Sequence, residues 1–407
     1  MVVPVALLSP LAATTACSSS SNSGTGASSS VPVFVPGFDG GGGSSGGQSS
    51  GITTGSQSSG GGTSGGASTT SGTASSSSTA VAIPSSGIVI TVIPDGTNDA
   101  AGLLAAIENA KAAVHVEMYL LTNQTYITAL INQHKAGVDV KVVLNQTFPT
   151  GTSAAQTNAS SYTSLKSGGV DVVWSPTTTG FDNYTHEKTV IIDPGATGEQ
   201  AWIMTMNLDT DAPKDNREYL AQDTNSADVT EAEAIFESDY AQTDITPTGN
   251  LVVAPAPPNN CASVLLQLVE SATTSIDMEA EEIDESGTST EAKVFAALVK
   301  QAKAGVAVKL VLEDSSESTQ SQAVSDLEAA GAKVVGYLYG NGLDIHAKAM
   351  VVDGARAYVG SENFTGGSLG YNREVGVYFE TASEVQKVDS TILQDFAGGS
   401  TYTASSQ

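Results

Sequence analysis

The stretch YTHEKTVIIDPG, residues 184–195, decides the fold, because its pattern returns later as DIHAKAMVVDG, residues 344–354. Each stretch contains a His, a Lys two residues further on, four intervening residues and an Asp. Alternate side chains of a β-strand share a face, so His186 and Lys188 point the same way, with Cα atoms about 7 Å apart. An imidazole beside an ammonium group on an apolar strand suits a small anion such as phosphate. The sequence therefore predicts an anion site at each copy.

Two copies of the pattern can supply both partners of an acid–base reaction. His346 and Lys348 form the second pair, and Asp193 and Asp353 follow the two apolar runs. Where the two pairs face each other across a pseudo-twofold axis, one His can attack phosphorus while the other protonates the leaving oxygen. The two Asp residues stand one strand-length beyond the histidines, where we expect them to brace the loops.

The repeat extends well beyond these two stretches. The segment IENAKAAVHVEMYLL (107–121) corresponds to VESATTSIDMEAEEI (269–283), and KAGVDVKVVL (135–144) corresponds to KAGVAVKLVL (303–312). Helical and strand patterns alternate within each copy, which predicts an α/β fold with a largely parallel sheet and helices on both faces. Two such units in one chain predict a monomer with an internal pseudo-dimer and one shared site.

Composition divides the chain into five segments. Residues 1–85 contain no Lys, Arg or Glu and carry long Ser/Gly/Thr runs, so their apolar surface is too small to offset the entropy of ordering them. The predicted segments are a signal-like start (1–17), a disordered Ser/Gly-rich tether (18–85), a first repeat (86–245), a Pro-rich connection (246–260) and a second repeat (261–407).

The first residues, MVVPVALLSPLAATTACSSSS, resemble the signal of a bacterial lipoprotein. The resemblance implies that Cys17 is lipidated and that the protein is exported, either lipid-anchored in the bacterial cell envelope or secreted. The alternative is an ordinary apolar tail with a free thiol. No run of about 20 apolar residues follows, so we expect no membrane-spanning segment after it.

The charge of the chain bears on its partners. The formal net charge is −27, and nearly all charged residues lie in residues 86–407. A strong negative field repels polyanions unless basic residues gather locally. A nucleic-acid partner is therefore possible but disfavoured, and a phospholipid suits this charge better.

Two HxKxxxxD patterns in one chain, each followed by an Asn and a later acidic residue, are similar to the phospholipase D superfamily. The second copy is followed by GSENF (360–364) and NREVG (372–376), whereas the first has a loop four residues longer and MTMN in place of GSEN. The resemblance implies two tandem phospholipase D-like α/β/α repeats related by a pseudo-twofold. It also implies residues that line the phosphate site and an acidic residue that orients a catalytic His. The matching residues are Ser361, Asn363 and Glu374 in the second repeat and Thr205, Asn207 and Glu218 in the first.

The resemblance further implies a double displacement that requires no metal and no cofactor. His186 attacks the phosphodiester and becomes a phosphohistidine, while His346 acts as general acid and then as general base. The groups expected to stabilise charge on the non-bridging oxygens are Lys188, Lys348, Asn207 and Asn363. The sequence contains no Cys or His cluster of the kind that binds metals.

Five further residues have less decisive patterns. Glu117 and Glu279 occupy matching strand positions, where a carboxylate could serve the site or only a neighbour's hydrogen bond. His115 and His134 have no Lys partner at the required spacing, so we interpret both as structural. Cys261 is the remaining Cys, and we expect it to be a small packing residue.

These patterns favour an enzyme, a phosphodiesterase of phospholipase D type that hydrolyses or transfers phosphatidyl groups. The first alternative is an exported endonuclease of the same superfamily, which would need a local basic groove. The second is a non-catalytic binding module presented at the cell surface on the Ser/Gly stalk. The sequence leaves open the head group, the acceptor, the choice between hydrolysis and transfer, and which of His186 and His346 is the nucleophile.

Overall fold

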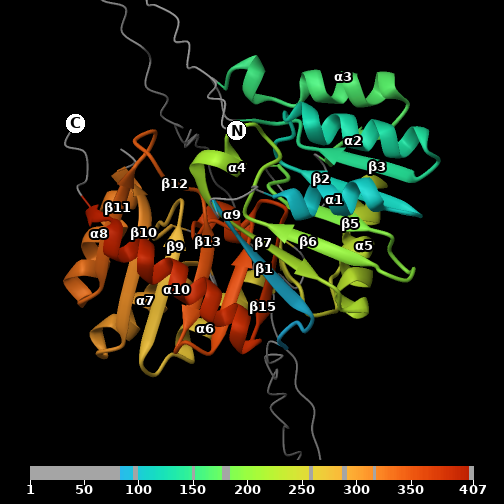
Figure 1. Cartoon of the computed structure of the whole chain (residues 1–407). Helices are drawn as coiled ribbons and strands as arrows, with labels where there is room; N and C mark the ends of the chain where they lie inside the picture. The colour runs from blue at the N-terminus through green and yellow to red at the C-terminus, as the bar shows by residue number, and fades with distance from the viewer. Residues whose placement is uncertain are drawn as a thin grey trace, which may run out of the picture. The chain divides into compact units, whose positions relative to one another are not determined.

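The computed structural model describes residues 83–94, 100–148, 152–176, 184–255, 260–286, 291–314 and 318–402. The signal-like segment with Cys17 and nearly all of the predicted tether lie outside these residues. In the described part, residues 86–245 and 261–402 each build a sheet with helices, and residues 252–254 of the connection add a strand (Figure 1).

The first sheet has eight strands. They are β1 (Ile88–Ile93), β2 (Ala113–Met118), β3 (Asp139–Leu144), β4 (Asp171–Trp174), β5 (Lys188–Ile192), β6 (Gln200–Met204), β7 (Asn216–Asp223) and β12 (Asp344–Ile345). Their order is β1-β7-β6-β5-β2-β3-β4, and β12 pairs with β7. Because β12 comes from the second repeat, the second repeat adds a strand to the sheet of the first.

The second sheet has the same order of equivalent strands. Its strands are β8 (Val252–Ala254), β9 (Ser275–Ala280), β10 (Ala307–Asp314), β11 (Lys333–Leu338), β13 (Lys348–Val352), β14 (Arg356–Gly360), β15 (Glu374–Phe379) and β16 (Ser400–Thr401). Their order is β16-β11-β10-β9-β13-β14-β15-β8. The shared order confirms the predicted pair of α/β repeats.

The expectation of a largely parallel sheet is wrong. Among the described strands, the parallel pairs are those within β2, β3 and β4, those within β9, β10 and β11, and the short pair of β12 with β7. The strands after each His-Lys pair, β5 and β13, are antiparallel to both neighbours. Short loops join β5 to β6 and β13 to β14, and a short loop permits only an antiparallel pair. Both sheets are therefore mixed.

The helices cover both sheets. In the first repeat they are α1 (Ala101–Asn109), α2 (Gln124–Lys135), α3 (Ala159–Gly168), α4 (Ala212–Asp215) and α5 (Ser226–Tyr240), with a short 3₁₀ helix at Ala154–Gln156. In the second they are α6 (Cys261–Glu270), α7 (Glu291–Lys303), α8 (Ser318–Ala330), α9 (Gly366–Gly370) and α10 (Ala382–Gly398). Helices α2 and α7 end before Gly137 and Gly305, which both have φ of 93°, and glycine adopts this left-handed conformation without strain.

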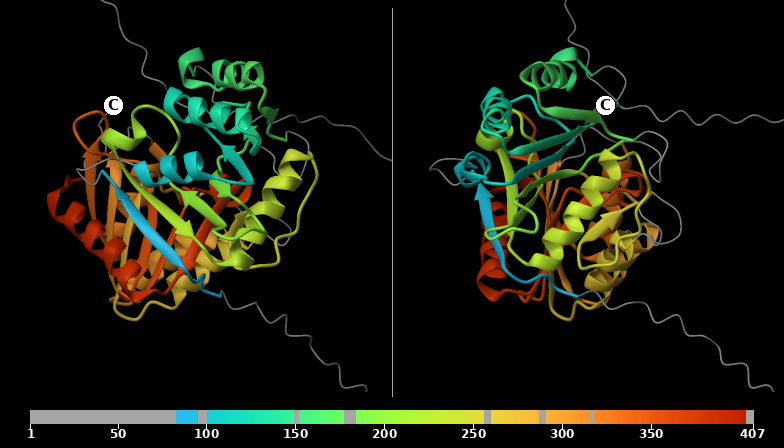
Figure 2. Two further views of the ribbon diagram at one scale, coloured as in Figure 1. Left: turned by 45° about the vertical axis from the view of Figure 1, so that its right-hand side comes forward. Right: turned by 90° about the vertical axis from the view of Figure 1, so that its right-hand side faces the viewer.

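Three apolar cores hold these layers together. One lies between α1–α3 and the first sheet, and another lies between α6–α9 and the second sheet (Figure 1). The third joins side chains of both sheets to α5 and α10, and α5 covers the opposite face of the first sheet from α1–α3 (Figure 2). Ile191 and Val351 lie in this central core, while their strand neighbours Val190 and Val352 face the outer cores. The strands that follow the His-Lys pairs are thus buried on both faces.

Candidate active site

The second repeat holds the imidazole of His186 in the first repeat. His186 lies two residues before β5, and its Nδ1 is 3.0 Å from both carboxylate oxygens of Glu374, the first residue of β15. Its backbone N–H donates to the carbonyl of Arg373 at 2.8 Å. Both the backbone and the ring of His186 are therefore fixed by two consecutive residues that lie almost 190 positions further along the chain.

The first repeat holds His346 in the same way. Its Nδ1 lies 2.8 Å from Glu218 Oε1, at ion-pair distance, although the ring is not aligned for a hydrogen bond. Strand β12, immediately before His346, pairs with Asn216 and Arg217 at the start of β7. The sequence predicted only that these acidic residues orient a catalytic His. The structure adds that each carboxylate serves the His of the opposite repeat.

Two buried ion pairs join the repeats next to these Glu residues. The sequence analysis missed them. Arg373 donates to Asp239 of α5 from Nε at 2.7 Å and from Nη2 at 3.1 Å. Arg217 donates to Asp395 of α10 from Nε at 2.6 Å and from Nη2 at 3.1 Å. Each Arg stands between the Asn and the Glu of an NRE triplet. The occurrence of this triplet in both repeats was the sequence signal that could have identified the two Arg residues. Each pair joins one repeat to the other.

Thr205 and Ser361 stand behind the two carboxylates. The Thr205 hydroxyl donates to Glu218 and accepts the N–H of Tyr219 at 2.9 Å. Ser361 accepts the N–H of Val375 at 3.1 Å. Both hydroxyl residues are fully buried. Their hydroxyls hold the neighbouring strands and carboxylates, and the expectation that they line the phosphate stays a prediction.

The two Lys residues of the motifs have different surroundings. Lys188 Nζ donates to the carbonyl of His186 at 2.6 Å and lies 5.4 Å from the centre of the Tyr119 ring. Lys348 Nζ donates to the carbonyl of His346 at 2.7 Å and forms an ion pair with Glu281 at 2.6 Å. Burial lowers the pKa of Lys188 to about 7, although the negative charge of Glu374 acts to raise it.

The Asn residues that follow the motifs keep unused bonding capacity. Asn207 and Asn363 are both more than nine-tenths buried, and Oδ1 of each has no hydrogen-bond partner among the described residues. The Asn363 amide donates to Glu281 at 3.2 Å. A buried acceptor without a partner is unfavourable, so each Oδ1 could accept from a donor on a bound ligand, whereas contact with phosphate oxygens would use the Nδ2 groups.

The electrostatics favour a neutral imidazole at His186. Burial lowers its pKa, and the opposing charge of Glu374 does not restore it. Burial alone would raise the pKa of Glu374, but its contact with the His186 ring, whose Nδ1 lies 3.0 Å away, and the charge of Lys188 lower it below the ordinary value. A neutral ring whose Nδ1 proton points at a carboxylate presents its Nε2 lone pair as a nucleophile.

Asp193 and Asp353 lie at the far ends of the motif strands from the histidines. Asp193 accepts the backbone N–H groups of Lys111, Ala112 and Ala113, with its shortest contact at 2.6 Å. Asp353 does the same for residues 273–275. Both have left-handed backbones, with φ of 50° and 53°. They brace the segments before β2 and β9, as expected from the spacing, and touch neither imidazole.

The other residues named from the sequence are not part of the pair of motif imidazoles and have structural contacts. The carboxylates of Glu117 and Glu279 accept hydrogen bonds from Thr185 and Tyr219, both at 2.6 Å. Burial raises the pKa of Glu117 and of Glu279 well above the ordinary value. Cys261 is buried at the start of α6. These contacts hold strands of the two repeats in place.

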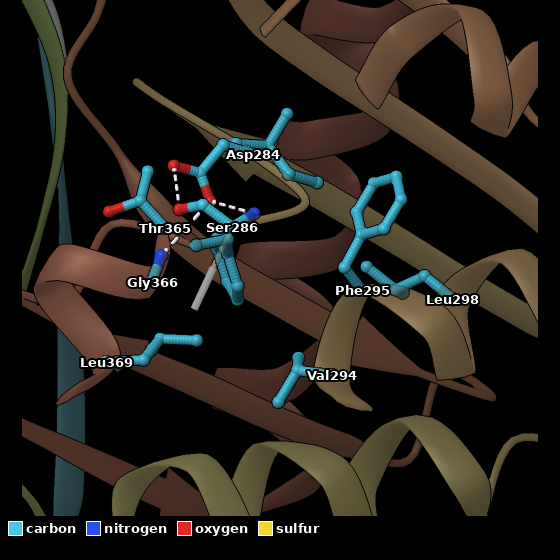
Figure 3. Close-up of a pocket in the computed structure, with 10 residues that line it drawn as sticks. Asp284, Ser286, Val294, Phe295, Leu298, Thr365, Gly366 and Leu369 are labelled. Atoms are coloured by element: carbon cyan, nitrogen blue, oxygen red, sulfur yellow. Dashed lines mark hydrogen bonds between the residues drawn. The ribbon is translucent and has the colours of Figure 1, made fainter. Parts of the chain in front are cut away.

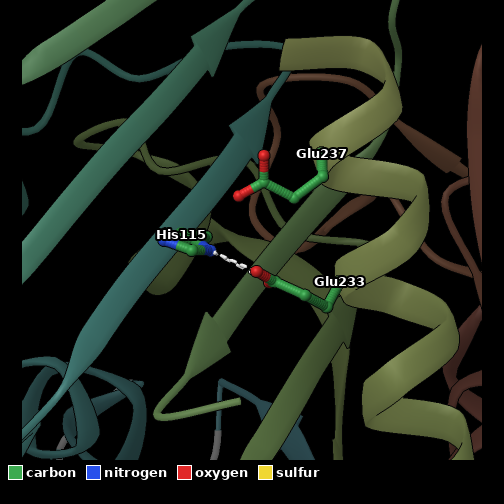
Figure 4. Close-up of side chains that lie close together, drawn as sticks. All are labelled: His115, Glu233 and Glu237. Atoms are coloured by element: carbon green, nitrogen blue, oxygen red, sulfur yellow. Dashed lines mark hydrogen bonds and ion pairs between the residues drawn. The ribbon is translucent and has the colours of Figure 1, made fainter. Parts of the chain in front are cut away.

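His115 belongs to a cluster with α5, and His134 lies in the last turn of α2. The His115 ring stacks on Phe236 with centroids 4.8 Å apart, and its Nδ1 is 2.9 Å from Glu233 (Figure 4). Glu237 lies close enough to join them around a metal ion, but it already forms an ion pair with Lys141. These contacts pack α5 against the sheet.

Comparison with known proteins supports the family. Residues 103–240 and 265–396 match the family described as cardiolipin synthase, PLD-like domain. A cardiolipin synthase of Listeria monocytogenes is 24% identical over 347 residues, which cover 75% of this chain and 68% of the relative. The probable cardiolipin synthase YwiE of Bacillus subtilis is 23% identical over 351 residues, covering 75% and 65%. The chain spans about two thirds of the length of these relatives.

Two solved structures share the fold. The polyphosphate kinase of Porphyromonas gingivalis has a TM-score of 0.57 at 12% identity, covering 75% of this chain and 46% of that one. The phosphatidylserine synthase of Haemophilus influenzae has a TM-score of 0.54 at 11% identity, covering 78% and 87%. The chain therefore belongs to the phospholipase D-like family, a family of phosphodiester-processing enzymes, as its two motifs predicted.

Among the described residues, no helix is both long and apolar enough to span a membrane.

Proposed function

We propose that this protein is a phosphodiesterase of phospholipase D type that hydrolyses or transfers phosphatidyl groups through a covalent phosphohistidine. One observation carries the proposal: each motif imidazole has its Nδ1 against a buried carboxylate of the other repeat. This reciprocal geometry orients two imidazoles, each followed by a buried Lys, within one electrostatic site. The charge of Lys348, for instance, lowers the pKa of His186, although burial lowers it more.

The first step uses His186 as the nucleophile. Its Nε2 lone pair attacks phosphorus and forms a P–N bond while the P–O bond to the leaving alcohol breaks. His346 donates a proton to that oxygen, so the alcohol leaves neutral. Lys188, Lys348, Asn207 and Asn363 donate to the non-bridging oxygens as negative charge grows there.

The second step reverses these roles. His346, now neutral, takes a proton from water or from an acceptor alcohol. The resulting oxygen nucleophile attacks phosphorus and displaces Nε2 of His186, which regenerates both imidazoles. With water the reaction is hydrolysis, and with an alcohol it is transfer of the phosphatidyl group.

The surroundings of the two rings support this assignment. His186 has one carboxylate, at Nδ1, and the edge-on ring of Tyr119 at 4.6 Å. His346 has carboxylates on both sides, Glu218 at 2.8 Å from Nδ1 and Glu281 at 3.5 Å from Nε2. Both ring nitrogens of His346 therefore face carboxylates.

Phospholipid as the substrate class rests on the relatives and on charge. The curated relatives are named as cardiolipin synthases, and one structural neighbour as a phosphatidylserine synthase. The net charge of −27 disfavours a polyanion such as DNA. We propose the same chemistry for this chain, acting on glycerophospholipid head groups.

The test compares substrates and motif variants of the full chain. Purified protein is incubated with phospholipid vesicles or with plasmid DNA, each with and without EDTA. We expect lipid turnover that EDTA does not abolish, and a loss of at least about 10³-fold in His186→Ala and His346→Ala. His134→Ala is the matched control, because His134 lies on α2, away from both motifs. Cleavage of DNA without lipid turnover would favour the endonuclease, and near wild-type rates in either motif variant would refute the mechanism.

A covalent intermediate gives an independent readout. Brief incubation with ³²P-labelled substrate followed by denaturation should leave label on the wild-type protein and none on His186→Ala. If every phosphodiester tried leaves the protein unlabelled and unchanged, the non-catalytic binding module becomes the better explanation.

The cellular location of the protein is a separate proposal. The apolar run that ends at Cys17, followed by Ser and Gly, supports lipidation at Cys17 and attachment to the bacterial cell envelope. Growth with a labelled fatty acid should label the full chain and leave Cys17→Ala unlabelled. Equal labelling of both, or labelling of neither, would argue against the anchor.

A further inference from the structure

The hydroxyl of Ser368 links two groups that the proposed mechanism uses. Ser368 lies on α9 and is 3% exposed. Its Oγ accepts the backbone N–H of Asn363 at 3.0 Å and donates to Oε1 of Glu374. In the proposed mechanism Asn363 donates to a non-bridging oxygen, and the Glu374 carboxylate lies 3.0 Å from Nδ1 of His186. One buried hydroxyl therefore connects the segment that faces the phosphate with the nucleophile.

The Glu374 carboxylate depends on donors from its own repeat. Besides the Ser368 hydroxyl, the Asn372 amide donates to the same Oε1 at 3.3 Å, which is near the long limit of a hydrogen bond. Glu374 is fully buried, and a buried carboxylate needs hydrogen-bond donors to remain ionised and in place. Loss of the Ser368 hydroxyl therefore weakens the support of the oxygen that faces His186.

The first repeat supports its carboxylate in a different way. Five residues after its motif Asn, the first repeat has Ala212 where the second has Ser368. A methyl group cannot donate, and Glu218 receives the hydroxyl of Thr205 instead. Because Thr205 also accepts the N–H of Tyr219 at 2.9 Å, its hydroxyl joins two neighbouring strands. In the second repeat the donor comes from a helix that is also bonded to the motif Asn, and it supports the carboxylate of the proposed nucleophile.

Helix α9 is itself held in place by hydrogen bonds. Thr365 caps it, since Oγ1 of Thr365 accepts the N–H of Ser368 at 3.3 Å. The N–H of Gly366 donates to Asp284 at 3.0 Å, and the N–H of Asp284 donates to the carbonyl of Phe364 at 3.2 Å. These contacts tie the helix to the segment after β9. The Ser368 hydroxyl is thus a group whose position the backbone defines.

The next residue of α9 provides a way to separate packing from hydrogen bonding. Leu369 lines a mainly apolar pocket with about 230 Å³ of empty space, together with Val294 and Leu298 of α7 (Figure 3). Ser368 does not line this pocket. A change at Leu369 therefore alters the packing of α9 while it leaves the Ser368 hydroxyl present.

We propose that Ser368 is a positioning residue that couples the binding of phosphate at Asn363 to the orientation of His186 through Glu374. This inference rests on the proposed function. While the Asn363 amide contacts a phosphate oxygen, the Ser368 hydroxyl holds the carboxylate against Nδ1 of His186, so that Nε2 faces phosphorus. Ser368 acts through Glu374 and touches neither the substrate nor the reacting atoms. No bond to Ser368 forms or breaks.

The first test measures kcat and KM of the full chain with soluble short-chain phosphatidylcholine and phosphatidylglycerol. Ser368→Ala removes the hydroxyl, and Ser368→Cys keeps a similar shape with only a weak donor. A hydrogen bond to a charged group corresponds to about 10- to 100-fold. We expect kcat to fall by this factor in both variants while KM changes by less than about threefold, because an interaction made in the transition state is lost. Leu369→Val is the matched control and should keep the wild-type kcat.

The second test needs no substrate. The chain contains four histidines, so labelling His with ¹⁵N gives few ring signals in NMR spectra, and His186→Ala identifies those of His186. The Nδ1 atom of His186 contacts Glu374 directly, so its signal reports the position of that carboxylate. We expect this signal to shift in Ser368→Ala and in Ser368→Cys, and to keep the wild-type position in Leu369→Val.

The outcomes separate this inference from the proposed function. A wild-type kcat or an unmoved Nδ1 signal in the two Ser368 variants would overturn the positioning role. Equal losses in Ser368→Ala and Leu369→Val would also overturn it, since the packing of α9 would then explain both. Absence of turnover and of covalent labelling in the wild type would refute the proposed function itself, whereas the NMR comparison would still test the contact with His186.

Discussion

The ion pair between Arg373 and Asp239 should be one of the largest single contributions to stability in this protein. The Arg side chain is 2% exposed and the Asp side chain 0%. The Asp carboxylate also lies within 4.8 Å of the carboxylates of Glu117 and Glu187. In Arg373→Met the guanidinium is lost, and the Asp charge stays buried among acidic groups. Removing one partner of a buried ion pair costs about 3–5 kcal/mol.

Equilibrium urea unfolding measures this loss. We expect the free energy of unfolding to fall by about 3–5 kcal/mol and the melting temperature to fall by roughly 6–10 °C for a chain of this size. The matched control is Lys300→Met, whose partner Glu270 lies 3.8 Å away on the surface, with side chains 74% and 52% exposed. An exposed pair contributes about 0–1 kcal/mol.

A double variant then isolates the pairwise effect. Arg373→Met combined with Asp239→Leu removes the unpaired buried charge, so it should recover part of the lost stability. The reasoning is refuted if Arg373→Met loses no more than Lys300→Met at an unchanged dependence on urea. It is also refuted if the double variant is less stable than the sum of the two single variants.

Three further predictions concern protonation and the strand ends. Burial, followed by the charge of Asp239, raises the pKa of Glu187 to about 8. The fold therefore favours the protonated carboxyl, so its contribution to stability is complete below pH about 4.5 and is lost as the pH rises through about 8. Unfolding free energies at pH 6 and pH 9 should show this fall, and Glu187→Gln should flatten it; an increase toward pH 9 would contradict it. Asp353→Ala should lose roughly 2–3 kcal/mol in urea unfolding, because it removes the acceptor of three backbone N–H groups. Hydrogen bonds outweigh burial and lower the pKa of Asp353 below the ordinary value, so its stabilising effect is lost on acidification, and a variant as stable as wild type at pH 7 would show that the carboxylate is dispensable. Since the pKa of Lys188 is about 7, kcat/KM should fall as the pH rises above 7, and Lys188→Arg, which stays charged, should move that fall to higher pH; an unmoved profile would exclude Lys188 as its origin.

Most of the fold could be predicted from local sequence patterns. The helix ending at Gly137 and the strands after each His-Lys pair follow from spacing and from the left-handed conformation that glycine allows. The bracing role of Asp193 and Asp353 also followed from position, since each stands just beyond an apolar strand. These features depend on neighbours along the chain, and the repetition of each pattern reinforced them.

The pairing of strands and side chains far apart in the sequence could not be predicted from local patterns. Alternation of helices and strands suggested parallel sheets, but the two hairpins that follow the motifs impose antiparallel neighbours. The contact between Glu374 and His186 joins residues 188 positions apart. Within one repeat, nothing in the spacing distinguishes a carboxylate that holds its own His from one that holds the His of the other repeat. The repeated NRE triplet showed that these residues act together without showing where.

In the proposed mechanism the two imidazoles have different tasks, and the position at which the repeats differ lies beside both rings. A symmetric pair of His-Lys motifs would make either His an equal candidate for attack on phosphorus. Tyr119 places an aromatic edge 4.6 Å from His186, which adds no charge, while Glu281 places a carboxylate 3.5 Å from Nε2 of His346. Burial lowers the pKa of His186, so the first environment favours a neutral ring. Because the proposed mechanism needs one nucleophile and one proton donor at the same moment, the difference in charge between Tyr119 and Glu281 distinguishes the two rings in that mechanism.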